Sequence, residues 1–251
     1  MTTPFAYDFG YSWPIVWGPL IPLAVFGALA IAGLLFKWRR WVVMASGVLA
    51  VWAFAALLIL HFLLRINLPM DPPTDRFLES GTGRVIDIGA GSGRATVGLL
   101  LRKPRVTITA IDIYKGYFGI EDNTPERLMK NARIAGVADR AEAKIGDARE
   151  LPLQDATYDG AISVAAIDHL PRAAIPKALA EVSRVLKPEG QFLLTVVKVD
   201  AWIWLASPPM AHMPSANPGR WRTLLESAGF DILEEGTRPG ALYFLARKRR
   251  S

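Results

Sequence analysis

Residues 85–96 of the chain read Val-Ile-Asp-Ile-Gly-Ala-Gly-Ser-Gly-Arg-Ala-Thr, and this stretch decides the fold class. Its apolar start predicts a short buried strand, and the glycines that follow predict a tight turn that opens a helix running to Leu101. A glycine at such a turn lets the backbone approach a ligand that a Cβ would exclude. Asp87 places a carboxylate at the end of the strand. The stretch therefore predicts a ligand-binding turn between a strand and a helix.

The spacing of this motif, Asp-x-Gly-x-Gly-x-Gly, differs from the fingerprint of dinucleotide-binding proteins. That fingerprint has a glycine or an alanine where this chain has Arg94. A nicotinamide-dependent oxidoreductase is therefore the weaker interpretation of the motif.

A second apolar strand is predicted over 106–111, and it ends at Asp112. This acid follows the glycines by about 20 residues, the spacing at which a carboxylate accepts hydrogen bonds from ribose hydroxyls. The competing interpretation is an aspartate that only stabilises a turn. The glycine motif in register with Asp112 favours the ribose role.

Strands and helices are predicted to alternate along the rest of the chain, which is typical of an α/β fold with a parallel sheet. A helix over 125–134 has Thr124 as its N-cap and Pro125 at its first position, and it ends at Gly136. The other predicted segments are strands over 141–145, 158–166, 191–197, 230–234 and 241–246, and helices over 175–186 and 220–228.

The order of these motifs resembles the class I S-adenosylmethionine (SAM) methyltransferases of the ubiquinone/menaquinone-biosynthesis and type 11 kind over about residues 80–200. The stretch 181–190, Glu-Val-Ser-Arg-Val-Leu-Lys-Pro-Glu-Gly, resembles the Glu-x-x-Arg-Val-Leu-Lys-Pro-Gly-Gly block of that family and departs from it at Glu189, in a turn. The resemblance implies a Rossmann-like, seven-stranded methyltransferase sheet, SAM as cofactor and S-adenosylhomocysteine as product. It gives the helix before Glu189 a structural role only.

The resemblance also implies which residues contact the cofactor. Asp147 is expected to accept a hydrogen bond from the adenine amino group, and the backbone N–H of Ala148 is expected to meet the ring. The full set of expected cofactor-binding residues is Asp87, Gly89, Ala90, Gly91, Gly93, Asp112, Ile113, Gly146, Asp147, Ala148 and Ser163.

Candidate catalytic residues follow the fourth predicted strand, because ligands bind beyond the carboxyl ends of the strands in open α/β sheets. His169 is the first candidate for a general base, since an imidazole titrates near neutral pH. Asp168 is expected to orient it or to bind substrate, and His212 to reach the site from a lid. The competing interpretations are that His169 only caps the strand and that an acidic acceptor needs no base. Tyr114 and Tyr117 are candidates for the pocket lining.

Composition excludes several kinds of chemistry. The chain has no cysteine, which excludes disulfides, thiolate zinc sites and iron–sulfur radical chemistry, and no metal site is predicted. The net charge is +6, and the basic end at 247–250 is expected to meet anionic lipid headgroups rather than nucleic acid. A solvated tail is the competing interpretation of these charges.

Two runs without Asp, Glu, Lys or Arg, at 15–36 and 41–64, precede the glycine motif. Each run exceeds the roughly 20 residues that cross a hydrocarbon core of about 30 Å, and neither shows a polar face. They predict two transmembrane helices, at about 14–36 and 41–64. The predicted organisation is a membrane anchor over 1–68, a proline-containing linker and a methyltransferase domain over 69–251.

Details of the two runs agree with a membrane hairpin. Ala24, Ala28 and Ala32 recur at every fourth residue, a pattern that lets a second helix or a second copy of the chain approach closely. The competing interpretation is that alanine is simply common in apolar helices. Tryptophans, which favour the membrane interface, lie at the expected helix ends: Trp13, Trp17, Trp38 and Trp41.

The expected orientation involves a conflict between two rules. SAM is cytosolic, so the methyltransferase domain is expected on the cytoplasmic side. The connecting loop nevertheless holds Lys37, Arg39 and Arg40, and the positive-inside rule favours keeping such a loop in the cytosol. Either the charges of the folded domain outweigh the loop, or the hairpin enters the membrane without fully crossing it.

The apolar stretch 201–205, with its two tryptophans, predicts either an irregular loop over the core or a lid that docks on the membrane. Together with the anchor, it favours a lipophilic acceptor, such as a quinone, a phenol or a lipid, as the methylated molecule. The alternatives are an anchored methyltransferase for a soluble small molecule and a SAM-binding membrane protein without activity.

Overall fold

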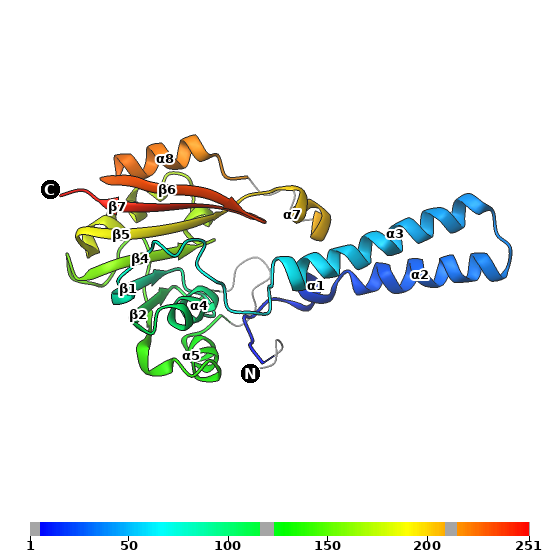
Figure 1. The fold of residues 1–251 in the computed structure, drawn as a ribbon, viewed down its shortest axis with the longest axis horizontal. Helices are drawn as coiled ribbons and strands as arrows, with labels where there is room; N and C mark the ends of the chain where they lie inside the picture. The colour runs from blue at the N-terminus through cyan, green and yellow to red at the C-terminus, as the bar shows by residue number, and fades with distance from the viewer. Residues whose placement is uncertain (1–5, 116–122, 209–214, 251) are drawn as a thin grey trace. The chain divides into compact units, whose positions relative to one another are not determined.

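The computed structural model describes residues 6–115, 123–208 and 215–250, drawn as a ribbon in Figure 1. The chain divides into two compact units. The sheet unit consists of Met1–Gly10, Asn67–Lys198 and Ser215–Ser251, and the hairpin unit of Tyr11–Ile66 and Val199–Pro214. This division differs from the expected boundary after residue 68 in two places: Met1–Gly10 joins the sheet unit, and Val199–Pro214 joins the hairpin unit.

The sheet unit contains a seven-stranded sheet with the strand order β3-β2-β1-β4-β5-β7-β6. The first five strands in the chain pair in parallel, while β7 runs antiparallel to both β5 and β6. This is the Rossmann-like methyltransferase sheet that the sequence predicts. Its strands are β1 (Thr82–Ile88), β2 (Arg105–Asp112), β3 (Ala141–Ile145), β4 (Tyr158–Val164), β5 (Leu186–Val197), β6 (Phe230–Arg238) and β7 (Ala241–Lys248).

Helices cover both faces of this sheet, and each face has its own hydrophobic core. Successive residues of β1 divide between the two cores, because side chains alternate along a strand: Val85 joins one and Ile86 the other. Leu99 and Leu128 belong to the first core, and Trp221 belongs to the second. The covering helices, labelled in Figure 1 except for α6, are α4 (Arg94–Arg102), α5 (Pro125–Ile134), α6 (Ile175–Val185) and α8 (Pro218–Ser227).

Most predicted segments are confirmed, although several ends shift: β1 begins at Thr82, and β6 extends to Arg238. Two of the shifts have a local cause. The β4 strand ends at Val164, earlier than predicted, because Ala165 adopts a positive φ of 48° and turns the chain. The β5 strand begins at Leu186, earlier than predicted, because Leu186 is extended and pairs with Tyr158. A register shift between Tyr158 and Gly160 accommodates this early pairing.

The predicted linker is not a free connection between the units. Met70 lies so close to α4 that a Cβ on Gly98 would be 1.9 Å from its carbonyl oxygen. The Met70 N–H donates to the Arg94 carbonyl oxygen at 3.0 Å, and Arg238 donates to the Pro73 carbonyl oxygen at 2.7 Å. These contacts fix the linker on the sheet unit.

Glu189 stands where the resembling family has glycine, and the structure gives it a positive φ of 64°. Its carboxylate lies 3.6 Å from the Arg247 guanidinium and 3.4 Å from that of Arg250. These two pairs are exposed and contribute little. A Cβ in the left-handed region costs roughly 1–2 kcal/mol. The position therefore favours glycine.

We expect Glu189→Gly to be more stable than Glu189→Ala by about 1 kcal/mol, because both variants lose the ion pairs and only alanine keeps the Cβ. Chemical unfolding of the two purified variants measures the difference. Equal stability of the two would show that the left-handed backbone at residue 189 carries no strain.

The hairpin unit consists of α1 (Trp13–Trp17), α2 (Leu20–Leu35), α3 (Arg40–Leu58), the π-helical turn η1 (Ile59–Leu63) and α7 (Ala201–Ala206). The helical runs of 23 residues from Trp13 to Leu35 and of 24 residues from Arg40 to Leu63 are long and apolar enough to cross a membrane. They lie close to the two helices that the sequence predicts.

The alanine stripe does not form the contact between the two long helices. Two of its three alanines, Ala24 and Ala28, are exposed, and Ala32 is half-buried. The close approach occurs instead at Gly33, which is buried and where an added Cβ would lie 2.7 Å from Cγ2 of Val43. The hairpin therefore packs through a different face of α2 from the one that the four-residue repeat suggests.

The stretch 201–205 is helical, which corrects the expectation of an irregular loop. Asp200 caps α7, since its carboxylate accepts from the N–H groups of Trp202 at 3.0 Å and Ile203 at 3.1 Å. Ile203 and Ala206 are buried. The predicted lid residue His212 lies outside the described residues.

Candidate functional site

The turn after β1 needs its glycines for two separate reasons. Gly89, Gly91 and Gly93 have positive φ values of 74°, 54° and 83°, which disfavour other residues. A Cβ at Gly89 would also lie 2.2 Å from the Ala166 Cβ, and one at Gly93 would lie 2.7 Å from Cγ of Leu128. At Gly91 an added Cβ would have ordinary contacts only. Backbone conformation and close packing therefore fix this turn.

Asp87 is buried near the end of β1, and one of its two carboxylate oxygens is hydrogen-bonded. Oδ2 accepts from the Thr96 hydroxyl at 2.5 Å, whereas Oδ1 has no hydrogen-bond partner within the described part of the chain. Burial raises the pKa of Asp87 to about 7; the Thr96 hydroxyl opposes this rise and the negative charge of Asp112 adds to it. An unpaired buried carboxylate oxygen is costly. The site therefore calls for a donor, preferably a cation, from a ligand.

Asp112 lies at the end of β2, beside the glycine turn. Its Oδ2 accepts from the Gly91 N–H at 2.9 Å, and its Oδ1 accepts from the Tyr114 N–H at 2.7 Å. Each carboxylate oxygen keeps a further lone pair, so the pair can still accept from the two hydroxyls of a ribose. The neighbouring Ile113 is half exposed. Asp112 thus both holds the turn and presents acceptors to a ligand.

Tyr114 brings a second unpaired polar atom to this region. Its hydroxyl is buried and has no hydrogen-bond partner among residues 6–115, 123–208 and 215–250. Burial raises its pKa, and the carboxylates of Asp112, Asp87 and Glu126 raise it further. Tyr117, the other predicted lining residue, is not among the described residues.

The turn after β3 is close-packed, and its acid is already paired. The Gly146 N–H donates to the Asp112 carbonyl oxygen at 3.0 Å, and a Cβ at Gly146 would lie 2.9 Å from Cγ2 of Ile111. The Asp147 carboxylate accepts from the Arg149 guanidinium at 2.5 Å, which lowers the pKa of Asp147. Both side chains are partly exposed, so this ion pair is weak and can open. The following Ala148 packs against the core.

Ser163 has a structural contact in place of a free hydroxyl. It is fully buried in β4, and its Oγ donates to the Ile88 carbonyl oxygen at 2.9 Å. This bond ties β4 to the end of β1, immediately before Gly89. Ser163 therefore positions the glycine turn.

Asp168 and His169 lie together in a 3₁₀ turn, η3 (Ile167–His169), beyond the end of β4. Asp168 Oδ2 accepts from the Val197 N–H at 2.8 Å, and its Oδ1 is buried without a partner in the described ranges. Burial raises the pKa of Asp168, and the charge of His169 opposes this rise. The structure thus brings two of the three candidate catalytic residues together at the carboxyl ends of β4 and β5.

The N-terminal segment reaches the glycine turn through Asn131, which the sequence analysis did not place in the site. Asn131 is fully buried in α5. Its Nδ2 donates to the carbonyl oxygens of Asp8 at 2.7 Å and Ser92 at 2.9 Å, and its Oδ1 accepts from the Asp8 N–H at 3.0 Å. An asparagine on the apolar face of the helix, three residues after Leu128, is the signal that could have pointed to this contact.

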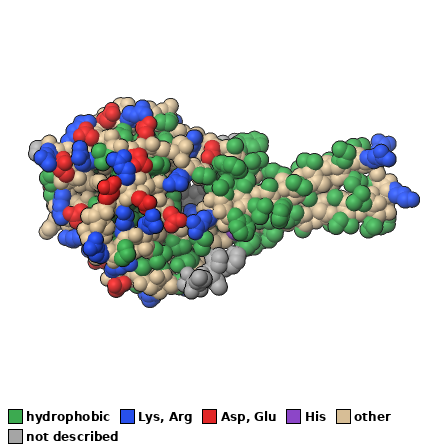
Figure 2. Space-filling model, viewed as in Figure 1, with side chains coloured by type: hydrophobic (Ala, Val, Ile, Leu, Met, Phe, Trp, Pro, Cys, Tyr) green, Lys and Arg blue, Asp and Glu red, His purple; other side chains and the backbone are tan. Residues whose placement is uncertain are grey.

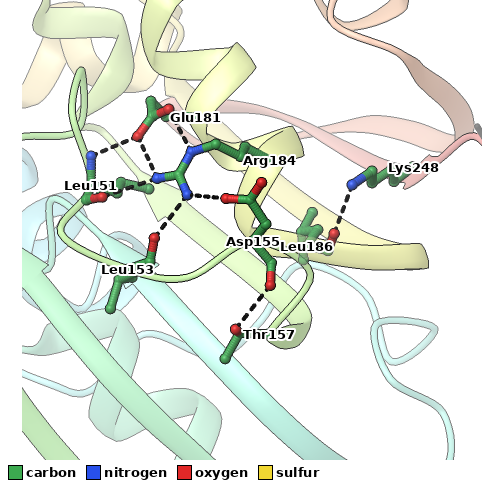
Figure 3. A network of polar contacts seen from close by, with 8 residues as sticks. All are labelled: Leu151, Leu153, Asp155, Thr157, Glu181, Arg184, Leu186 and Lys248. Carbon is green, nitrogen blue, oxygen red and sulfur yellow. Dashed lines mark hydrogen bonds and ion pairs between the residues drawn. The ribbon is translucent and has the colours of Figure 1, made fainter.

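Arg184, in the block of 181–190, holds the segment that follows Asp147 and Ala148. Figure 3 shows its guanidinium between two carboxylates. It donates to Glu181 at 2.7 Å and to Asp155 at 2.6 Å. It also donates to the carbonyl oxygens of Leu151 at 3.0 Å and Leu153 at 2.8 Å. These contacts give the block a structural role.

We expect Arg184→Ala to lower the free energy of unfolding by about 2–3 kcal/mol, because several charge-assisted hydrogen bonds are lost at once. Arg222→Ala is the matched control: it removes a single exposed pair with Glu235 and is expected to lower the free energy of unfolding far less than Arg184→Ala does. Chemical unfolding of both variants measures these values. Equal effects would show that the Arg184 contacts are no stronger than an ordinary surface pair.

Residues 85–190 match the family described as methyltransferase domain. The ubiquinone/menaquinone biosynthesis C-methyltransferase of Bartonella bacilliformis is 28% identical over 155 residues, covering 57% of this chain and 56% of that protein. The protein of the same name from Brucella anthropi is 32% identical over 153 residues, covering 57% and 55%. The chain thus spans about half the length of these curated relatives. A SAM-dependent methyltransferase structure from Methanosarcina mazei has a similar fold, with a TM-score of 0.55 at 21% identity, covering 73% of this chain and 100% of that one.

Proposed function

We propose that this chain, a class I SAM-dependent methyltransferase, is anchored in a membrane and methylates a lipophilic small molecule there. The observation that carries the cofactor part is the unpaired, buried oxygen of Asp87 beside a turn that tolerates no Cβ at Gly89 or Gly93. The observations that support the membrane part are the two long apolar helices.

The residues of the site fit SAM. The free oxygen of Asp87 suits the cationic amino group of the methionine part, and the glycine turn leaves room for the cofactor backbone. Asp112 has acceptor capacity for the ribose hydroxyls, and the Asp147–Ala148 segment suits the adenine. SAM supplies a methyl group on a sulfonium, which is already a good leaving group.

The chain has two tasks beyond binding SAM. It must align the acceptor with the methyl group, which lowers the barrier by up to roughly 7–11 kcal/mol. It must also take a proton from a hydroxyl or amine acceptor, and His169 is the proposed base, with Asp168, whose Oδ1 is buried, beside it. An acidic phenol would need alignment only.

The exposure of the two long helices supports a membrane anchor. In Trp13–Leu35, only 6% of an 18-residue apolar stretch is buried inside the structure. In Arg40–Leu63, only 28% of such a stretch is buried. A core helix of a soluble protein would be mostly buried. Figure 2 shows hydrophobic side chains along this hairpin and Lys or Arg side chains at one of its ends. In the sequence, Lys37, Arg39 and Arg40 connect the two long helices.

The segments that flank the hairpin support an arrangement in which both ends of the hairpin lie on the same side of the membrane. Asp8, before the first helix, is hydrogen-bonded to Asn131 of the sheet unit. Leu68, after the second, accepts from the Arg94 side chain at 3.0 Å. Both flanks therefore belong to the unit that binds SAM, and we propose that this side is the cytoplasm. The basic connection then lies deep in the bilayer or beyond it, where Lys and Arg can reach headgroups.

The names of the curated relatives support a lipophilic acceptor. Both matched enzymes belong by name to ubiquinone/menaquinone biosynthesis, and quinones of that kind dissolve in membranes. An anchor concentrates an enzyme where such molecules are dissolved. A quinone, phenol or lipid is therefore the proposed acceptor class for this chain.

Native membranes containing the full chain, incubated with methyl-deuterated SAM, test the proposal. We expect the label in the lipid extract by mass spectrometry, and no label with the Asp112→Ala chain. Label confined to water-soluble small molecules would favour the anchored enzyme with a soluble substrate. Binding of SAM without any formation of S-adenosylhomocysteine would favour a protein without activity.

A further inference from the structure

The short helix α7 belongs to the hairpin unit, although it lies in the sequence between β5 and α8 of the sheet. It packs against α3 and η1. Ala206 joins a buried apolar cluster with Val16, Ile59, Leu60 and Ile66. The hairpin is thus completed by a segment that the chain supplies after its fifth strand.

The two sides of α7 differ in what they contact. Ile203 and Ala206 are buried, and Ala206 belongs to the apolar cluster of the hairpin unit. Trp202, Trp204 and Leu205 are exposed by 44%, 60% and 39%. Residues 201–206 contain no charged side chain, and the large exposed side chains of α7 are two tryptophans and a leucine. A soluble surface rarely exposes such a cluster without a function.

Contacts inside the hairpin unit place α7 at one particular end of the hairpin. His61 Nε2 lies 3.2 Å from the Val16 carbonyl oxygen, and the His61 ring lies 4.5 Å from that of Trp17. The start of the first long helix and the end of the second are therefore adjacent, and α7 packs there. The charged connection at Lys37–Arg40 is at the opposite end.

We propose that α7 is an interfacial helix that lies along the bilayer surface, with Trp202 and Trp204 in the headgroup–acyl boundary. The inference rests on the proposed insertion of the hairpin. Six residues of helix extend only about 9 Å, so α7 is far too short to span and can only lie in the interface. Tryptophan favours that zone. The exposed Trp13, at the start of α1, lies at the same end and continues the aromatic belt.

A short connection links α7 to the end of the sheet where ligands bind. Ligands of an open α/β sheet bind beyond the carboxyl ends of its strands. The chain passes from Val197, at that end of β5, to the start of α7 within four residues, which span at most about 14 Å. The chain itself therefore keeps the start of α7 within that reach of the end of β5, whatever the orientation of the two units.

The test measures the depth of α7 in vesicles, and it uses the absence of cysteine from the chain. An environment-sensitive dye is attached to the full chain at Trp204→Cys or, as a second position on α7, at Trp202→Cys. Val48→Cys, on an exposed position of α3, reports hairpin insertion, and Ser227→Cys, exposed on α8, is the control outside the hairpin unit. The vesicles contain phosphatidylcholine and phosphatidylglycerol with a nitroxide either high or low on the acyl chain.

We expect the α7 dyes to be quenched several-fold more by the shallow nitroxide than by the deep one. The Val48 dye should show the reverse order, and the Ser227 dye should not be quenched. If Val48 is quenched while both α7 positions behave like Ser227, the interfacial helix is excluded and the anchor stands. If Val48 is not quenched, the hairpin is not inserted, and both proposals fail.

Discussion

Asp112→Ala is expected to weaken SAM binding by about 10²–10⁴-fold, with calorimetry on the purified chain as the measurement. A hydrogen bond to a charged group contributes roughly 1.5–3 kcal/mol, and the carboxylate is proposed to accept two from the ribose. Each 1.4 kcal/mol corresponds to about a tenfold change in affinity. Alanine also frees the Gly91 and Tyr114 N–H groups, which loosens the glycine turn. Both effects act in the same direction.

Two further variants separate these effects. Asp112→Asn keeps one acceptor and the shape of the side chain, so it should lie between the wild type and alanine. Asp139→Ala removes an exposed aspartate from the turn before β3, at the opposite edge of the sheet, and should leave SAM binding unchanged. Wild-type affinity in Asp112→Ala for both SAM and S-adenosylhomocysteine would exclude the ribose role and place the nucleoside elsewhere.

The parts of the site that the sequence predicts well are local. The glycine turn, Asp87 and Asp112 follow from a strand pattern, a glycine spacing and an acid at the next strand end. Each of these signals lies within a few residues of the group it positions, and parallel order brings the strand ends to one edge. The Thr124 cap of α5 is of the same kind, since its hydroxyl accepts from the Arg127 N–H only three residues away.

The parts that the sequence does not predict depend on partners far apart in the chain or on which face a helix presents. Asp8 and Asn131 are 123 residues apart, and the sequence around either residue does not indicate that the other is its hydrogen-bond partner. The alanine repeat of α2 indicates a face of small residues but not what that face contacts. In the structure, α3 approaches α2 closely at Gly33 instead. The apolar stretch of α7 predicts burial or membrane contact equally well, because both require the same side chains.

Asp87→Asn is expected to change stability and SAM binding in opposite directions. Burial raises the pKa of Asp87 from 3.8 to about 7. The folded state therefore holds this proton more tightly than the unfolded state. The resulting stability is fully present below about pH 4 and is lost as the pH rises through about 7. Asparagine stays neutral, so at pH 8 the variant without SAM should be more stable than the wild type, by about 4 kcal/mol at most.

Thermal unfolding between pH 4 and pH 8 measures this difference, which should vanish at the acidic end. Asp159→Asn is a control with the opposite sign. Burial tends to raise the pKa of Asp159, but Lys187 and the Arg84 N–H outweigh it and hold that pKa below its usual value. This variant should therefore be less stable than the wild type near neutral pH, and its deficit should shrink as the pH falls.

SAM binding should become tighter as Asp87 ionises, although the fold without ligand disfavours the ionised form. The wild type is expected to bind SAM more tightly as Asp87 ionises between about pH 6 and pH 8, because the cationic amino group meets a carboxylate. Asp87→Asn should bind weakly and without this slope. A stable variant that kept the pH-dependent affinity of the wild type would show that SAM does not use the unpaired oxygen. In the proposed site, a carboxylate that is unfavourable in the empty fold becomes favourable only when the cation of SAM is bound.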